Sequence, residues 1–248
     1  MENQVTKPKF PTEIVDLPSK GLLYSKDNPL SSGTIEMKYM GAREEDILTN
    51  SNYIQQGTVL DKLLDSLIVS KVDLKDMIIG DKNAILIASR VLGYGKDYEF
   101  ESGGKTYKVD LTTLTDKELP KDVDYTNGNE FYFTLPASKL EVGYKILTHG
   151  DEAAIDQELK GLKKLFPNGS APEISTRLKY ILTSVNGDKE RKTVREFVDN
   201  ELLAIDSRAL RQEIKRISPD IDLTIKGDEG EDIAVPISLN FFWPDANL

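Results

Sequence analysis

The chain has 248 residues, a formal net charge of −10 and no cysteine. The acidic balance argues against a nucleic-acid partner, because affinity for nucleic acid comes mainly from Lys and Arg side chains that neutralise phosphates, and the lack of cysteine excludes disulfides and thiolate metal sites. The sequence shows neither a signal-peptide core within residues 1–20 nor an apolar run of the about 18 residues that a membrane span needs. We therefore expect a protein made in the cytosol without a membrane partner. The length allows one large domain or two smaller ones.

Residues 1–33 are predicted to form an extended docking arm, because prolines interrupt any long helix and turn-forming Ser and Gly residues separate them. The arm also carries apolar side chains, which favours contact with a surface, its own or a partner's, over exposure to water. The candidate partner-binding residues of the arm are Leu17, Leu22, Leu23 and Tyr24.

Residues 34–111 are predicted to form an N-terminal α+β half. It has a short strand, an acidic helix start near Arg43 and an apolar-striped segment from Thr58 to Val69, which is typical of a core-facing helix. Asp81 is the predicted N-cap of the next helix, since its carboxylate can accept from N–H groups of a first turn. Glycines end this helix. Alternation of apolar and polar residues from Tyr98 to Val109 then predicts a β-hairpin.

Residues 130–248 repeat this construction after a polar linker at residues 112–129. Asp206 can cap a helix that is followed by a second alternating hairpin, and both Thr58 and Thr193 begin sequences that resemble capping boxes. These echoes predict an α+β fold of two related halves, produced by a diverged duplication. The alternative is chance similarity between two ordinary helix–hairpin units.

The sequence contains little that could perform catalysis. His149, the only histidine, lies at a predicted helix start, and it is expected to be a hydrogen-bonded loop residue there because a lone histidine cannot hold a metal without further ligands. Neither glycine pattern, at Gly93 or at Gly104, has the spacing of a phosphate-binding loop, and no Gly-x-Ser-x-Gly motif occurs. We predict no catalytic, cofactor or metal site, no small-molecule substrate and no enzyme activity. A peptidoglycan glycoside hydrolase is the alternative, because 42 acidic residues offer many carboxylate pairs.

Large aromatic residues gather near the C-terminal end of the chain. Phe241, Phe242 and Trp243 are expected either to fold back onto the body or to insert into a partner, because leaving all three in water is unfavourable. Both alternatives stay open, and all three residues are candidate partner-binding residues.

Several segments carry a family resemblance when they are read in order. They are Leu17-Pro18-Ser19-Lys20-Gly21-Leu22-Leu23-Tyr24, the helix from Gly80-Asp81 to Gly95, Leu147-Thr148-x-Gly150-Asp151-Glu152, Asp206 to Arg211, and Phe241-Phe242-Trp243-Pro244. In this order, over most of the chain, they resemble the T-even-type baseplate protein family of contractile-tailed bacteriophages, the small hub-associated baseplate subunits. The order of the segments, more than any one motif, carries the resemblance.

The resemblance implies a non-enzymatic structural component of the tail baseplate, assembled in the host cytoplasm and carried in the virion. It implies docking to neighbouring baseplate and hub proteins through the termini, with a transient hub-assembly chaperone as the alternative. Relatives in this family carry Cys-x-x-Cys pairs at both hairpin tips, which suggests zinc. Here the tips, Glu101 to Lys105 and Lys226 to Asp232, have no thiol, so no metal role is implied and the hairpins are expected to hold by side-chain packing.

Overall fold

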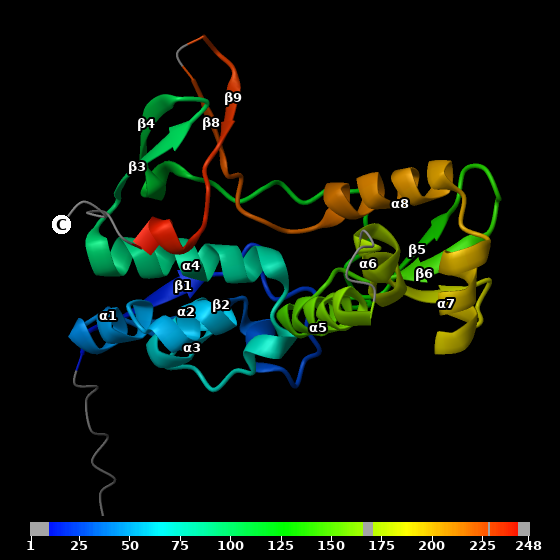
Figure 1. The fold of residues 1–248 in the computed structure, drawn as a ribbon, viewed down its shortest axis with the longest axis horizontal. Coiled ribbons are helices and arrows are strands. Elements are labelled where there is room, and N and C mark those ends of the chain that lie inside the picture. The colour runs from blue at the N-terminus through cyan, green and yellow to red at the C-terminus, as the bar shows by residue number, and fades with distance from the viewer. Residues whose placement is uncertain (1–9, 166–170, 228, 243–248) are drawn as a thin grey trace, which may run out of the picture.

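The computed structural model describes residues 10–165, 171–227 and 229–242, and it has the predicted α+β class. Within these residues, eight α-helices accompany four small antiparallel sheets. Figure 1 shows two clusters of helices along the long axis, with both β-hairpins at one end. In this part of the chain no helix is long and apolar enough to cross a membrane.

The first cluster, which we call the first repeat, begins with a two-stranded sheet and ends with the predicted hairpin. Its strands are β1 (Thr12–Asp16), β2 (Thr34–Lys38), β3 (Asp97–Ser102) and β4 (Lys105–Asp110), and its helices are α1 (Ala42–Leu48), α2 (Ser51–Gln56), α3 (Val59–Leu67), the short 3-10 helix η2 (Leu74–Asp76) and α4 (Ile79–Tyr94). The strands pair as β1–β2 and β3–β4. Gly95, with φ of 84°, ends α4 as predicted.

The second cluster, the second repeat, has a similar order of elements, with one additional strand and one helix fewer between its second strand and its last helix. Its strands are β5 (Phe131–Thr134), β6 (Glu141–Tyr144), β7 (Leu182–Val185), β8 (Thr224–Lys226) and β9 (Asp232–Ala234), and its helices are α5 (His149–Leu165), α6 (Glu173–Ile181), α7 (Arg191–Asn200) and α8 (Ala204–Ile217). Strands β5, β6 and β7 form one sheet in that order, and β8 pairs with β9 as predicted. The 3-10 helix η4 (Leu239–Phe242) follows.

The two repeats share specific contacts as well as element order. In the first, Lys38 at the end of β2 forms an ion pair of 2.8 Å with Glu44 in the first turn of α1. In the second, Lys145 just after β6 forms a pair of 2.7 Å with Asp151 in the first turn of α5. Each carboxylate also accepts from the backbone N–H three residues before it, which is the arrangement of a capping box. The contacts support the predicted duplication, with α1 corresponding to α5.

The two repeats also share a buried aspartate, which has a different role from the predicted N-cap. Asp81 and Asp206 are each the third residue of their helix, and each lies fully buried. Asp81 accepts from the backbone N–H and the hydroxyl of Ser19, at 2.9 and 2.6 Å, in the turn after β1. Asp206 accepts from the backbone N–H groups of Ala137 and Ser138, at 2.7 and 3.0 Å, in the turn after β5. The N-cap prediction is therefore wrong: each aspartate fixes a distant strand turn to a helix.

The correspondence of the remaining helices corrects a second prediction. Ile68, directly after α3, bridges β2, and Leu182, directly after α6, pairs with β6. Helix α3 therefore corresponds to α6, whereas α7 takes the place of the short η2. The proposed capping boxes at Thr58 and Thr193 are wrong, because Thr58 makes no side-chain cap and Thr193 donates to Asp188 instead.

The expected arm and linker are packed parts of the fold. Residues 12–16 form the sheet strand β1, while residues 1–9 lie outside the described residues. In the stretch predicted as a linker, Lys117 N–H donates to the carbonyl of Asp220 at 2.8 Å, and the Tyr125 hydroxyl donates to that of Ile217. Figure 1 shows β8–β9 beside β3–β4. The end of the second repeat thus packs against the first repeat.

Candidate functional site: the joint between repeats and an open groove

Most of the predicted partner-binding residues lie in the core of the chain itself. The buried ones are Leu17, Leu23, Tyr24, Phe241 and Phe242. Leu22 is exposed, and Trp243 lies outside the described residues. Burial gives the five core side chains no free surface, so a docking role through them is replaced by a structural one.

The two C-terminal phenylalanines fold back onto the first repeat. The buried Arg90 of α4 donates through Nε to the carbonyl of Phe241 at 3.0 Å, and through its other nitrogens to those of Gly95 and Asp97. Its pKa is lowered by burial. The rings of Phe241 and Tyr98 meet edge to face with centroids 4.7 Å apart. Of the two alternatives for this segment, the structure shows the folded-back one for residues 241–242.

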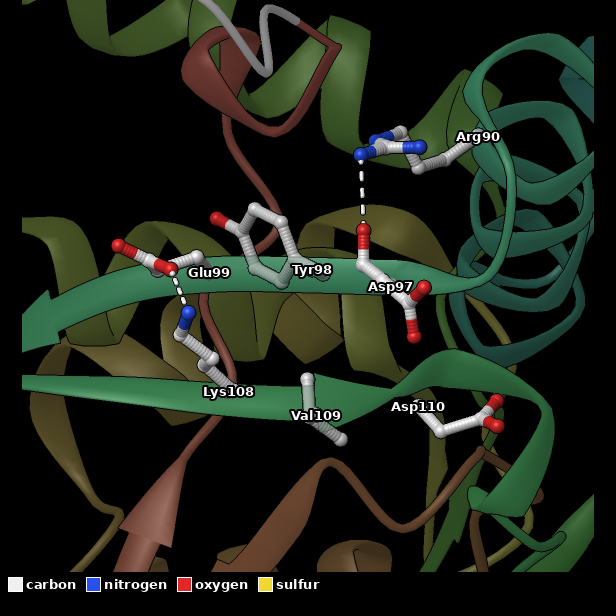
Figure 2. A pocket seen from close by; sticks show the side chains of 7 residues that line it. All are labelled: Arg90, Asp97, Tyr98, Glu99, Lys108, Val109 and Asp110. Atoms are coloured by element: carbon white, nitrogen blue, oxygen red, sulfur yellow. Dashed lines mark hydrogen bonds and ion pairs between the residues drawn. The ribbon is translucent and has the colours of Figure 1, made fainter.

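A cavity of about 550 Å³ lies beside this contact, against the hairpin β3–β4. Figure 2 shows Arg90 directed at the carbonyl of Asp97, and the Glu99 carboxylate beside the Lys108 ammonium, at 2.9 Å. Asp110, also in the lining, pairs with Lys96 at 2.6 Å. Glu99, Lys108 and Asp110 are therefore each already in an ion pair, which leaves these three charges less available to a ligand.

His149 lies at the joint where α5 meets the first repeat. Its Nε2 is 3.2 Å from Asp61 Oδ1, and its Nδ1 is 3.0 Å from Lys82 Nζ. Lys82 Nζ is 2.7 Å from the same Asp61 oxygen. Burial alone would raise the pKa of Asp61, but hydrogen bonds from His149 and Lys82 outweigh it and lower the pKa to about 2. Asp61 is therefore a carboxylate held ionised between two donors.

The contacts of this cluster link the two repeats, and they give it a structural role. Both ring nitrogens of His149 have partners, and within the described residues no group of three His, Cys, Asp or Glu side chains could hold a metal ion. His149 lies at the expected helix start and is hydrogen-bonded as expected, although it is the first residue of α5 and so belongs to the helix and not to a loop. A groove of about 800 Å³ runs from this cluster between α3, α4 and α5.

Further backbone and side-chain contacts complete the joint. His149 N–H donates to the carbonyl of Met77 at 2.7 Å, and Asn83 donates to Asp220 at 3.0 Å. Gly80 allows the chain after α8 to pass closely, because a Cβ at this position would overlap the carbonyl oxygen of Pro219. The start of α4 is therefore covered by the second repeat.

The start of α8 and the face of α6 form an open groove, a feature that the sequence reading missed. Its volume is about 560 Å³, and its lining includes Pro172, Ile174, Leu178, Val198, Leu202 and Ala204. Ile174 at the lining is 54% exposed, and Leu203 and Ile205 beside it are 49% and 61% exposed. Exposed apolar side chains gathered around a groove are typical of an interaction surface. We call this the α6–α8 groove.

A sequence signal for the α6–α8 groove exists in hindsight. Leu202, Leu203 and Ile205 are three apolar residues gathered just before the buried Asp206, at the point where α8 begins. The equivalent apolar residues before Asp81 are covered by the other repeat, so only knowledge of the repeat packing separates the two cases.

Comparisons with known proteins give no further guide. No protein-family model, no curated protein and no solved structure matches this chain significantly.

Proposed function

We propose that the chain is a non-enzymatic structural subunit of a phage tail baseplate, which docks to neighbouring baseplate or hub subunits. The α6–α8 groove is the observation that carries the docking role. Ile174 lines it and is exposed, and the exposed Leu203 and Ile205 flank the lining residue Ala204 in the sequence, so burying this group in a neighbour would be favourable. The specific assignment to a baseplate, and so to the virion, rests on the family resemblance.

The docking surface differs from the one that the termini suggested. Five of the terminal candidates, Leu17, Leu23, Tyr24, Phe241 and Phe242, pack in the chain's own core. The groove offers a preformed surface instead. A preformed apolar groove is suited to binding protein neighbours with little reorganisation.

The test is quantitative mass spectrometry of purified phage particles assembled with the wild-type chain, with Ile205→Asp or with Ile14→Asp. Ile14 is the matched control, because it is 64% exposed and lies on β1, in the first repeat. We expect the wild type and Ile14→Asp at the same fixed stoichiometry, and Ile205→Asp strongly depleted. Absence of the wild-type chain from particles, with abundance in infected cells, would contradict the proposal and favour a transient assembly chaperone.

A further inference from the structure

The α6–α8 groove corresponds position by position to a surface of the first repeat. The register is fixed by the bridge partners Ile68 and Leu182 and by the buried Asp81 and Asp206. In this register, Asp61, Ile79 and Lys82 of the first repeat correspond to Ser175, Ala204 and Ser207 of the second. All six line a groove in their own repeat.

The first-repeat surface has an occupant within the chain. The start of α5 rests on it, with His149 in contact with Asp61 and Lys82. The second-repeat surface has no such helix start on it within the described residues, and its apolar rim is exposed. In a chain built of repeats, the surface that each repeat offers to the next is left open at the last repeat. The open groove thus fits the start of another repeat.

The helix that corresponds to α5 is α1, and the first two residues of α1 are exposed among the residues that the structure describes. Asp151 corresponds to Glu44, so His149 corresponds to Ala42. Ala42 and Arg43 are exposed, whereas His149 is half-buried in the joint. A second copy of the chain can therefore supply the missing helix start.

We infer that the α6–α8 groove binds the start of α1 from a second copy of this chain, in a head-to-tail contact. The chemistry of the two surfaces changes together. Where the first repeat joins a charged Asp61 and Lys82 to His149, the groove offers the hydroxyls of Ser175 and Ser207, and α1 offers the small Ala42. Removing the charges from both sides avoids burying an unpaired ion at the contact.

Charge at the edge of the groove agrees with this occupant. Arg43 corresponds to Gly150, which packs closely on η2 at Lys75. In the second repeat α7 replaces η2, and it ends beside the exposed Glu201. A cation is favourable at a helix C-terminus and next to a carboxylate. Arg43 of the incoming copy would therefore meet a negative end of α7.

The packing explains why the first repeat has a glycine where the second has an isoleucine. Gly80 corresponds to Ile205, and a side chain at Gly80 would overlap Pro219. The segment that contains Pro219, residues 218–223, has no counterpart in the first repeat, where β3 begins two residues after Gly95. A second copy would bring no such segment to Ile205, so this side chain can pack against the incoming helix. A head-to-tail contact of this kind closes into a ring or extends as a filament.

The test is sedimentation velocity of the purified full chain over a wide range of concentrations. We expect the mean mass to rise with concentration, and Ala42→Arg or Ile205→Asp to weaken association by about tenfold or more. The controls Ala234→Arg, at an exposed position of β9, and Ile14→Asp should associate like the wild type. A wild type that stays monomeric throughout, or association that neither Ala42→Arg nor Ile205→Asp weakens, would overturn the inference.

This inference names the partner of the proposed docking groove, so it rests on the proposed function, but the two can fail separately. A monomeric wild type together with depletion of Ile205→Asp from particles would overturn the head-to-tail contact and place another subunit in the groove. Self-association that Ala42→Arg weakens, in a chain absent from particles, would support the contact and contradict the baseplate role.

Discussion

Replacing Asp81 with alanine should lower the free energy of unfolding by about 3–5 kcal/mol. The carboxylate accepts three hydrogen bonds: from the N–H and hydroxyl of Ser19, and from the Tyr24 hydroxyl at 2.6 Å. All three residues are buried. Each buried donor left without a partner costs about 1–3 kcal/mol. The two hydroxyls can turn toward other acceptors, so the total for the three donors stays near the low end of what three such losses would give.

The equivalent substitution Asp206→Ala is the matched comparison. It also frees two N–H groups, but Ala137 is exposed and Ser138 is half-buried, so water can reach them. We expect a smaller loss of about 1–2 kcal/mol. The assay is equilibrium unfolding in urea, with the slope compared between variants to show that the unfolded states match. A loss for Asp81→Ala no larger than that for Asp206→Ala would refute this reasoning.

The two aspartates should also respond to acid with opposite signs. Burial raises the pKa of Asp81 above its ordinary value of 3.8, although its hydrogen bonds oppose this. Burial acts in the same direction on Asp206, but the N–H donors outweigh it and lower its pKa. By linkage, the wild type should gain stability over Asp81→Asn as pH falls toward 3.8, and should lose its advantage over Asp206→Asn below 3.8. Unfolding curves of both asparagine variants from pH 7 to pH 3 measure this difference.

Three further substitutions test the joint and the C-terminal segment. Asp61→Asn should lower the free energy of unfolding by about 1 kcal/mol at pH 7, after allowance for the partial exposure of Asp61. This loss should vanish as pH falls from about 4 to about 2, because the pKa of Asp61 is about 2. A loss that stays the same in acid would contradict the ion cluster. Gly80→Ala should destabilise by several kcal/mol by forcing the repeats apart, roughly as an overpacked core does, whereas Gly161→Ala, in open space on α5, should stabilise by about 0.5–1 kcal/mol in thermal melts. Phe241→Ala should cost about 3–5 kcal/mol in urea unfolding, against less than about 0.5 kcal/mol for the exposed Tyr132→Ala; equal costs would mean that the C-terminal segment does not pack as described.

The local elements were predictable because their signals are local. The hairpin from Tyr98 to Val109 follows from alternation around a turn, and the end of α4 follows from Gly95. The predicted duplication came from the similar helix–hairpin units, and the shared contacts of the two halves support it. The structure confirms the predicted α+β class. This class could be predicted because it depends on these short-range patterns.

The roles of buried polar residues were not predictable, because they depend on contacts far apart in the sequence. Asp81 looks like an N-cap from its position before an apolar stripe, yet its partners lie near Ser19. The apolar Leu17 and Phe241 look like docking residues until the first is found in the hydrophobic core and the second beside Arg90. Exposure at Ile205 depends on which surface the other repeat covers. Sequence periodicity contains no record of that packing.

The most direct test of the head-to-tail contact uses the natural lack of cysteine in this chain. Two single-cysteine variants, Ala42→Cys and Ser175→Cys, are mixed and oxidised, and the cross-linked peptides are identified by mass spectrometry. The double variant Asp61→Cys with His149→Cys, at the equivalent joint within one chain, calibrates the reaction. We predict a mixed disulfide between Ala42→Cys and Ser175→Cys, and far less between Ala42→Cys and the control Ala234→Cys. Equal yields from both mixtures would show that α1 does not bind in the groove.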